Sequence, residues 1–284
     1  MSRLLNATLI TTLALSANSE VLTQKQLMSY VKRSIIKNPR VKVKNIEITE
    51  VKTDTRIPDW KVIFTAMKLT YQGKEITAPL MLFKNGNIIT STLYDLNSST
   101  DYTQVIKASI PDSVYNDEHL IYGTKNSSHK ILVFSDPQCP FCQDVMPDIF
   151  KAAKEHPDLF ALYYYHLPLK RLHPVSDTLT KVMHIAQKEG RKDIFEDMYK
   201  LEINIRETNE DKILEKIKKQ FNYTLTKEQL NTPEVKKVLK ADEDIAAKLM
   251  IQGTPTVYFD GEFDKMRDGY EKYLPKKEDK NKGQ

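Results

Sequence analysis

The sequence contains two cysteines, and they lie only three positions apart. Cys139 and Cys142 form the motif Cys-Pro-Phe-Cys, which follows a short apolar run at residues 130–134 and opens a segment with helical periodicity. A disulfide between them would close almost no loop and would therefore add little stability. A cysteine pair between a buried strand and a helix start instead indicates a reactive centre on an α/β framework.

The position of this motif favours ionisation of its first cysteine. Free N–H groups and the helix dipole stabilise negative charge at a helix N-terminus, and the thiolate is the nucleophilic form of cysteine. We expect Cys139 to be exposed and acidic, and Cys142, one turn later, to be more shielded. Cys139 would attack a substrate disulfide and Cys142 would resolve the mixed disulfide. Pro140 suits the first helical turn, where no N–H is needed.

Two other interpretations of the cysteine pair compete with this one. The pair could be half of a zinc site, but zinc requires four ligands, no second cysteine pair exists, and the six histidines are scattered. The pair could also be two inert core thiols, although Asp136 and Gln138 beside the motif argue against burial. We therefore expect neither a metal nor a cofactor.

A second motif lies far downstream of the cysteines. Gly253, Thr254, Pro255 and Thr256 lead into an apolar run at residues 257–259. Proline at the start of a strand has no N–H to donate. If the Thr254–Pro255 bond is cis, the chain turns sharply and leaves the Thr254 backbone free to pair with an extended peptide. Turns of this composition are common, so the motif is informative only together with the cysteine pair.

The N-terminus has the features of a secretory signal peptide. Arg3 precedes a short apolar stretch, and the small residues Ala17 and Ser19 then offer a cleavage site. The stretch is too short to span a bilayer. Residues 1–19 are therefore interpreted as a signal and the protein as exported, with an ordinary N-terminal helix as the alternative.

Residues 20–94 predict a compact α+β domain. Apolar residues first recur at helical spacing and then alternate with polar residues, as in half-buried strands. Turns at Gln72-Gly73 and Asn85-Gly86 predict an antiparallel meander. The open edge of such a sheet favours two-fold pairing with a second copy. Residues 95–117, which include a short helical pattern, are expected to connect this domain to the next.

Residues 118–275 predict an α/β domain with a long helical insertion, followed by a charged tail at 276–284. Thr232-Pro233 is a good helix start within the insertion. The elements expected in this domain are a strand at 130–134, the helix after the cysteines, a strand at 160–166, helices over 176–250, a strand at 257–259 and a helical segment ending near 274.

The charge pattern argues against nucleic-acid binding. The formal net charge is +5 over 284 residues, and the acidic residues are interspersed with the basic ones. Nucleic-acid-binding proteins usually gather lysine and arginine on one stripe. Groups such as Lys216, Lys218 and Lys219 are instead typical of solvated helix faces.

Taken together, the two motifs resemble the periplasmic Dsb proteins of Gram-negative bacteria, and among them the DsbC/DsbG group. This resemblance implies a homodimer with an N-terminal dimerisation domain and a thioredoxin-like catalytic domain. It assigns Cys139 as the attacking cysteine, Cys142 as the resolving cysteine and Pro255 as a cis-proline, and Thr254 is similar to the residue of isomerase-type members. The dipeptide Pro140-Phe141 is nearer to DsbA and DsbG, which leaves the direction of electron flow open.

The expected function is therefore isomerisation or reduction of disulfides in unfolded or misoxidised exported proteins, with an unidentified membrane redox partner. Two alternatives are a DsbA-like oxidase that donates its own disulfide and a holdase chaperone. His173 could approach the active site or be an ordinary loop residue. Asp136 could tune Cys139, but a role in shaping the turn is favoured.

Overall fold

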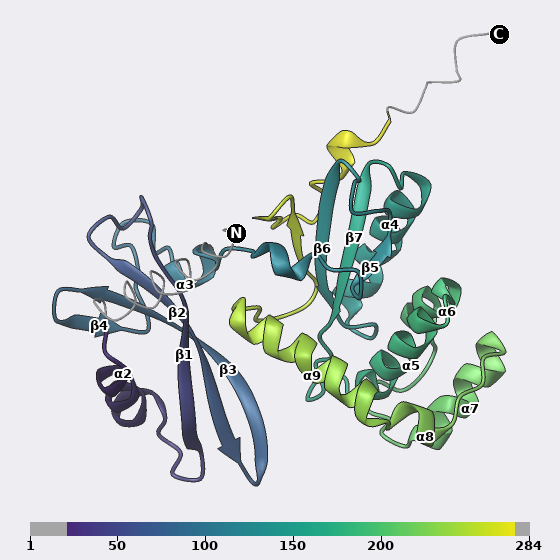
Figure 1. Ribbon diagram of the computed structural model, residues 1–284, viewed down its shortest axis with the longest axis horizontal. Coiled ribbons are helices and arrows are strands. Elements are labelled where there is room, and N and C mark those ends of the chain that lie inside the picture. Colours follow the sequence, from purple (N-terminus) through teal and green to yellow (C-terminus); the bar gives the residue numbers. More distant parts are fainter. Residues whose placement is uncertain (1–21, 276–284) are drawn as a thin grey trace, which may run out of the picture. The chain divides into compact units, whose positions relative to one another are not determined.

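The computed structural model describes residues 22–275 and divides into two compact units (Figure 1). The first unit ends at Ser109 and also includes Ala247–Met250, while the second comprises the rest of the chain from Ile110 onward. The division falls within the segment 95–117 that was expected to connect two domains. The expected signal peptide, 1–19, and the charged tail, 276–284, lie outside the described residues.

The first unit contains a four-stranded antiparallel sheet whose strands lie in chain order. They are β1 (Lys42–Thr53), β2 (Lys61–Tyr71), β3 (Lys74–Asn85) and β4 (Ile88–Thr90). The helical segment at its start is α2 (Gln24–Tyr30), which begins with a capping box at Thr23 and continues as η1 (Val31–Ile35). Leu27 and Val31 are fully buried against the sheet. The predicted helix plus antiparallel meander is confirmed.

The two turns of this sheet differ in how well the sequence predicted them. Gln72 and Gly73 both have positive φ, 49° and 78°, as a tight hairpin requires. The second turn lies one residue later than expected, at Gly86-Asn87, because Asn85 still pairs with Ile88. The strand that was expected to reach Tyr94 ends at Thr90, so β4 has only three residues.

The segment after β4 is packed rather than free. The short helical pattern expected within residues 95–117 corresponds to α3 (Tyr102–Val105), which Asp101 caps. Tyr102, Ile106 and Ala108 are buried in the apolar cluster of the first unit. Burying these side chains stabilises the segment against the sheet, so it is part of the first unit up to Ser109.

The second unit contains a five-stranded mixed sheet in the order β5-β7-β6-β8-β9. β6 (His129–Ser135) runs parallel to β7 (Phe160–His166) and antiparallel to β8 (Thr256–Phe259). The helix α4 (Pro140–Glu155) connects β6 to β7. The sequence predicted these four elements, and the short strand β9 (Glu262–Phe263) pairs with β8 in antiparallel fashion.

The edge strand β5 (Leu120–Tyr122) was not predicted, because three residues give no readable periodicity. It pairs with β7 in antiparallel fashion. Gly123 follows it with φ of +76°, and a Cβ atom there would lie 2.0 Å from the carbonyl oxygen of Phe160. This close approach of two backbones requires glycine.

The insertion between β7 and β8 is helical but interrupted (Figure 1). Residues 201–209 and 222–226 are not helical, so the expected near-continuous helix is wrong in those places. The final helical segment is reduced to η4 (Glu271–Tyr273). The insertion comprises α5 (Ser176–Lys188), α6 (Lys192–Asp197), η3 (Met198–Lys200), α7 (Glu210–Phe221), α8 (Lys227–Leu230) and α9 (Pro233–Lys248).

The core of the second unit fixes α4 against the sheet. Met146, Ile149 and Phe150 on the buried side of α4 belong to the same apolar cluster as Val133 of β6 and Leu162 of β7. This burial holds the N-terminus of the helix, and with it the cysteine motif, in one place. Among the described residues, no helix is both long and apolar enough to cross a bilayer.

Candidate functional site

The first cysteine begins the helix α4. Cys139 is the N-cap residue and Pro140 occupies the first turn, as the sequence predicted. The expectation that Cys139 is exposed is wrong, because only 4% of it is accessible. Cys142 is fully buried, whereas Phe141 between them is 65% exposed. The motif therefore presents its phenylalanine to solvent and keeps both sulfur atoms covered.

The second motif lies directly against the first. The Thr254–Pro255 peptide bond is cis, as expected. The Cys139 thiol donates a hydrogen bond to the carbonyl oxygen of Thr254, with 3.5 Å between sulfur and oxygen. The sequence had suggested that the Thr254 backbone would be free to pair with a peptide, but its carbonyl oxygen already accepts this bond. The Thr254 Oγ1 atom is buried without a hydrogen-bond partner among the described residues. Arg267 Nε donates to the carbonyl oxygen of Pro255 at 3.2 Å and supports this loop.

The two cysteines have opposite acidities. The pKa of Cys139 is lowered to about 5, mainly by a hydrogen bond from the Cys142 thiol. The Thr254 hydroxyl and the N–H groups of Cys142 and Phe141 lower it further, while burial opposes them. Burial is the main reason why the pKa of Cys142 is raised. At neutral pH Cys139 therefore favours the thiolate form, and Cys142 retains its proton.

The turn before the cysteines is held by a buried carboxylate. Asp136 is fully buried, which contradicts the expectation that the residues flanking the motif are exposed. Its oxygens accept hydrogen bonds from the N–H groups of Gln138 and Leu169, at 2.8 and 2.7 Å, and from the Ser176 hydroxyl at 2.5 Å. His173 Nδ1 lies 3.0 Å away and completes the set. Asp136 thus shapes the turn. His173 contacts Asp136, and this contact is its connection to the site.

The second unit also holds a buried group of hydroxyls that the sequence did not predict. The Tyr199 hydroxyl donates to Ser135 Oγ at 2.7 Å and lies 2.6 Å from the Tyr164 hydroxyl. All three residues are almost completely buried. Tyr164 belongs to β7, and Tyr199 lies in the helical insertion, which carries no sequence signal for a site.

The comparison with known protein families covers the second unit. A family profile described as thioredoxin matches residues 115–274, which is more than half of the chain. The chain belongs to the thioredoxin family. The matched range includes both cysteines, Thr254 and Pro255, so the thioredoxin domain contains the whole candidate site. The narrower resemblance to the DsbC/DsbG group stays a prediction.

Several solved structures resemble part of the chain at low identity. A thioredoxin-like oxidoreductase from Silicibacter pomeroyi DSS-3 is 23% identical, with a TM-score of 0.45, covering 55% of this chain and 88% of its own. ScsC from Proteus mirabilis, in a transitional conformation, is 23% identical with a TM-score of 0.46, covering 57% and 72%. Oxidised BdbD from Bacillus subtilis is 17% identical with a TM-score of 0.45, covering 59% and 93%. No curated protein sequence matches the chain.

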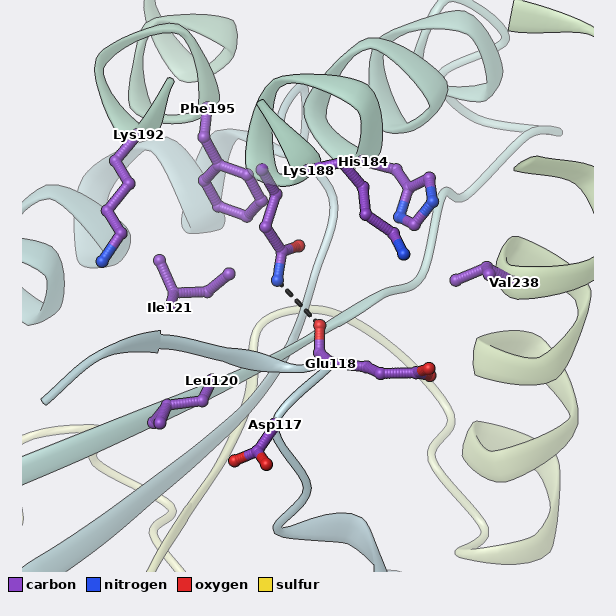
Figure 2. Close-up of a pocket in the computed structure, with 10 residues that line it drawn as sticks. Asp117, Glu118, Leu120, Ile121, His184, Lys188, Lys192, Phe195 and Val238 are labelled. Carbon is purple, nitrogen blue, oxygen red and sulfur yellow. Dashed lines mark hydrogen bonds between the residues drawn. The ribbon is translucent and has the colours of Figure 1, made fainter. Parts of the chain in front are cut away.

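The thioredoxin domain also has a cavity away from the cysteines (Figure 2). Its volume is about 350 Å³, and it is lined by residues of β5, α5, α6 and α9, including His184, Lys188 and Phe195. At its wall Gln187 Nε2 donates to the carbonyl oxygen of Glu118 at 2.7 Å. Neither cysteine lines this cavity, so it is separate from the thiol chemistry. Among residues 22–275, no cluster of three or more His, Cys, Asp and Glu side chains is arranged to hold a metal.

Proposed function

We propose that the protein is a thiol–disulfide oxidoreductase that isomerises or reduces disulfides in unfolded or misoxidised exported proteins. The observation that carries the proposal is the division of acidity within one cysteine pair, with the pKa of Cys139 lowered to about 5 and that of Cys142 raised. A thiolate beside a protonated thiol supports attack by the first sulfur and resolution by the second.

The proposed reaction begins with attack of the Cys139 thiolate on a client disulfide. A bond forms between Cys139 Sγ and one client sulfur, and the other client sulfur leaves as a thiolate with the electron pair. In isomerisation, a second client thiolate then attacks the mixed disulfide and releases Cys139 unchanged. In reduction, Cys142 attacks Cys139, the client leaves with both electrons, and the enzyme carries the new disulfide.

Homodimerisation through the first unit is part of the proposal. β3 pairs with β4 only at Phe83–Asn85, so within the described residues its longer N-terminal part has β2 as its one partner. An open edge of this length favours pairing with an identical edge around a two-fold axis. The proposal places the dimer in the periplasm of a Gram-negative bacterium, with a membrane redox partner that keeps it reduced.

Refolding of a protein with scrambled disulfides tests the proposed activity. The reduced wild-type protein is expected to restore the activity of the scrambled substrate in catalytic amounts. Cys139→Ser should abolish this, while Cys142→Ser should accumulate mixed disulfides with the substrate. Insulin reduction, assayed in parallel, separates general reductase activity from isomerisation. No gain over buffer from the wild-type protein in either assay would reject the proposal.

An oxidase is the second candidate, because the lowered pKa of Cys139 stabilises the reduced form and makes the disulfide form oxidising. Trapping whole cells with a thiol-alkylating reagent distinguishes the two. An isomerase is held reduced in the cell, whereas an oxidase is held oxidised. A holdase chaperone would instead prevent aggregation equally well after replacement of both cysteines by serine.

A further inference from the structure

The loop in contact with Cys139 is held by a second contact one residue further along. The carbonyl oxygen of Thr254 accepts a hydrogen bond from the Cys139 thiol at 3.5 Å. The carbonyl oxygen of Pro255 accepts one from Arg267 Nε at 3.2 Å. Because proline has no N–H, this carbonyl is the one backbone group of Pro255 that a hydrogen bond can hold. Arg267 therefore fixes the loop at the residue next to the one that contacts the sulfur.

The segment that carries Arg267 is itself attached to β8 and to the core. The N–H of Asp264 donates to the carbonyl oxygen of Val257 in β8 at 2.9 Å, which fixes the start of the segment. The Asp264 carboxylate accepts hydrogen bonds from the N–H groups of Arg267 and Gly269, at 2.8 and 2.7 Å. Tyr270, which is 4% accessible, fixes the end of the segment in the apolar core. The backbone of Arg267 is thus held on both sides.

Arg267 has a backbone conformation that arginine rarely adopts. Its φ angle is +66°, in the left-handed region, where the Cβ atom of any residue except glycine is crowded. Glycine would occupy the position without this cost. Residues held in such conformations are concentrated at functional sites, where the surrounding structure compensates for the strain. Within residues 22–275 the Arg267 guanidinium forms no ion pair, and its hydrogen bond is the one to Pro255, so this bond is the role that the side chain offers.

We infer that Arg267 is a positioning residue that holds the Thr254–Pro255 loop against the Cys139 sulfur and thereby limits the size of the reactant that can approach this sulfur. The inference rests on the proposed function and concerns its first step, the attack by Cys139. Only 4% of Cys139 is accessible. Without the bond from Arg267 the Pro255 carbonyl is released, the loop can move away from the sulfur, and bulkier groups gain access to it.

Alkylation of the reduced protein with two maleimides of different size tests this inference. N-ethylmaleimide is small, whereas N-pyrenylmaleimide carries a rigid aromatic group next to the reactive ring. Both react with the thiolate in the same way, so the ratio of their rate constants at Cys139 measures access and not acidity. Arg267→Gly is expected to raise the pyrenyl rate by about tenfold and the ethyl rate by no more than about twofold, because one hydrogen bond contributes on this scale to holding the loop in place.

Arg267→Gly also distinguishes positioning of the loop from general stabilisation of the fold. Glycine adopts a positive φ without crowding, which offsets the loss of the hydrogen bond, so the urea midpoint should stay close to the wild-type value. A merely stabilising residue would change the midpoint and leave the ratio of the two rates unchanged. Arg267→Lys retains a charged donor on a side chain of similar length and should restore most of the wild-type ratio.

Lys265→Gly is the matched control. Lys265 is an exposed basic residue two positions before Arg267, in the same segment. Its replacement removes one positive charge and adds backbone freedom, as Arg267→Gly does, but leaves the bond to Pro255 in place. The ratio of the two maleimide rates should therefore equal that of the wild type.

The outcomes separate this inference from the proposed function. A folded Arg267→Gly protein with the wild-type ratio of maleimide rates would overturn the inference and leave the proposed function standing. An equal rise of the ratio in Lys265→Gly would also overturn it, because flexibility of the segment would then control access. If Arg267→Gly does not fold, as judged by circular dichroism, Arg267→Met removes the donor and decides by the same readout. Alkylation requires no catalysis, so failure of the proposed function would be seen in the scrambled-substrate and insulin assays instead.

Discussion

The Sγ atom of Cys139 lies 3.5 Å from the carbonyl oxygen of Thr254, although the two residues are 115 positions apart in the chain. The thiol can donate to this oxygen, but the thiolate cannot, so ionisation removes the contact. The Thr254 hydroxyl, which is buried without a partner among the described residues, is then the group on this loop that can donate to the sulfur. Thr254 therefore opposes ionisation with one oxygen and supports it with the other.

The first prediction concerns the reactivity of Cys139. Because its pKa is lowered to about 5, its alkylation rate should rise through pH 5 and level off well below the value of about 8.5 for a free thiol. Cys142 should react much more slowly. Mass spectrometry after brief alkylation of the reduced protein measures both rates. Faster modification of Cys142 would reverse the assigned roles.

The second prediction concerns the stability of the reduced protein. The pKa of Cys139 is about 5 when folded and 9.0 in its ordinary state, so between these values the unfolded chain binds more protons than the folded one. Stability from the thiolate is then fully present above pH 9 and is lost as pH falls toward 5. Urea unfolding of the reduced wild type and of Cys139→Ser measures this. Parallel stability curves for the two proteins would contradict it.

The third prediction concerns Thr254. Thr254→Val keeps the shape of the side chain but removes the hydroxyl. The reduction potential should shift by about 30 mV, equivalent to about 1.4 kcal/mol, the scale of one hydrogen bond to a charged group. Isomerisation of a scrambled substrate should fall more than insulin reduction. If potential and isomerisation both stay unchanged, Thr254 only packs, and the preference for isomerase loses its main support.

The fourth prediction concerns the buried carboxylate of Asp136. Asp136→Asn replaces one accepting oxygen by a donor and should destabilise the fold by about 2–4 kcal/mol, because several buried donors lose their acceptor. The turn before Cys139 should loosen, and alkylation of Cys139 should change with it. Asp144→Asn, an exposed position on α4, is the control and should unfold at the wild-type urea concentration. Equal midpoints for both variants would show that Asp136 does not hold the turn.

The fifth prediction concerns the proposed dimer. Ile76 lies on the open part of β3 and is 43% exposed. Ile76→Lys should place a charge at the paired edge and convert a dimer to a monomer in light scattering at micromolar concentration. Leu96→Lys changes a more exposed leucine outside the sheet and should remain dimeric. A monomeric wild-type protein would refute the proposed assembly.

Periodicity and turn chemistry were sufficient to predict the elements that carry the site. β6, α4 and β7 were readable because a compact apolar run, a proline at the helix start and a second apolar run follow one another. The cis bond before Pro255 was also anticipated. The edge strand β5 was missed because three residues show no periodicity. The helices of the insertion were predicted to be longer than they are, because the segments between them have no strong turn signal.

Burial at the site could not be read from the sequence. Cys139 and Asp136 are covered by segments that join the site from distant parts of the chain, namely the Thr254 loop and the start of α5. The buried group of hydroxyls also depends on the insertion, which brings Tyr199 beside Ser135. Such contacts arise from tertiary packing, which local propensity does not encode.

The small accessible fraction of Cys139 has a consequence for client selection. Cys139, the proposed nucleophile, is 4% accessible and contacts the Thr254 carbonyl oxygen, so we expect a disulfide on a rigid, convex protein surface to be sterically excluded from it. A client disulfide can reach the Cys139 sulfur only if it lies in a narrow and mobile segment of the client chain. Disulfides of correctly folded proteins would not react, whereas those of misfolded proteins would. The selection would depend on the mobility of the client chain and not on its sequence.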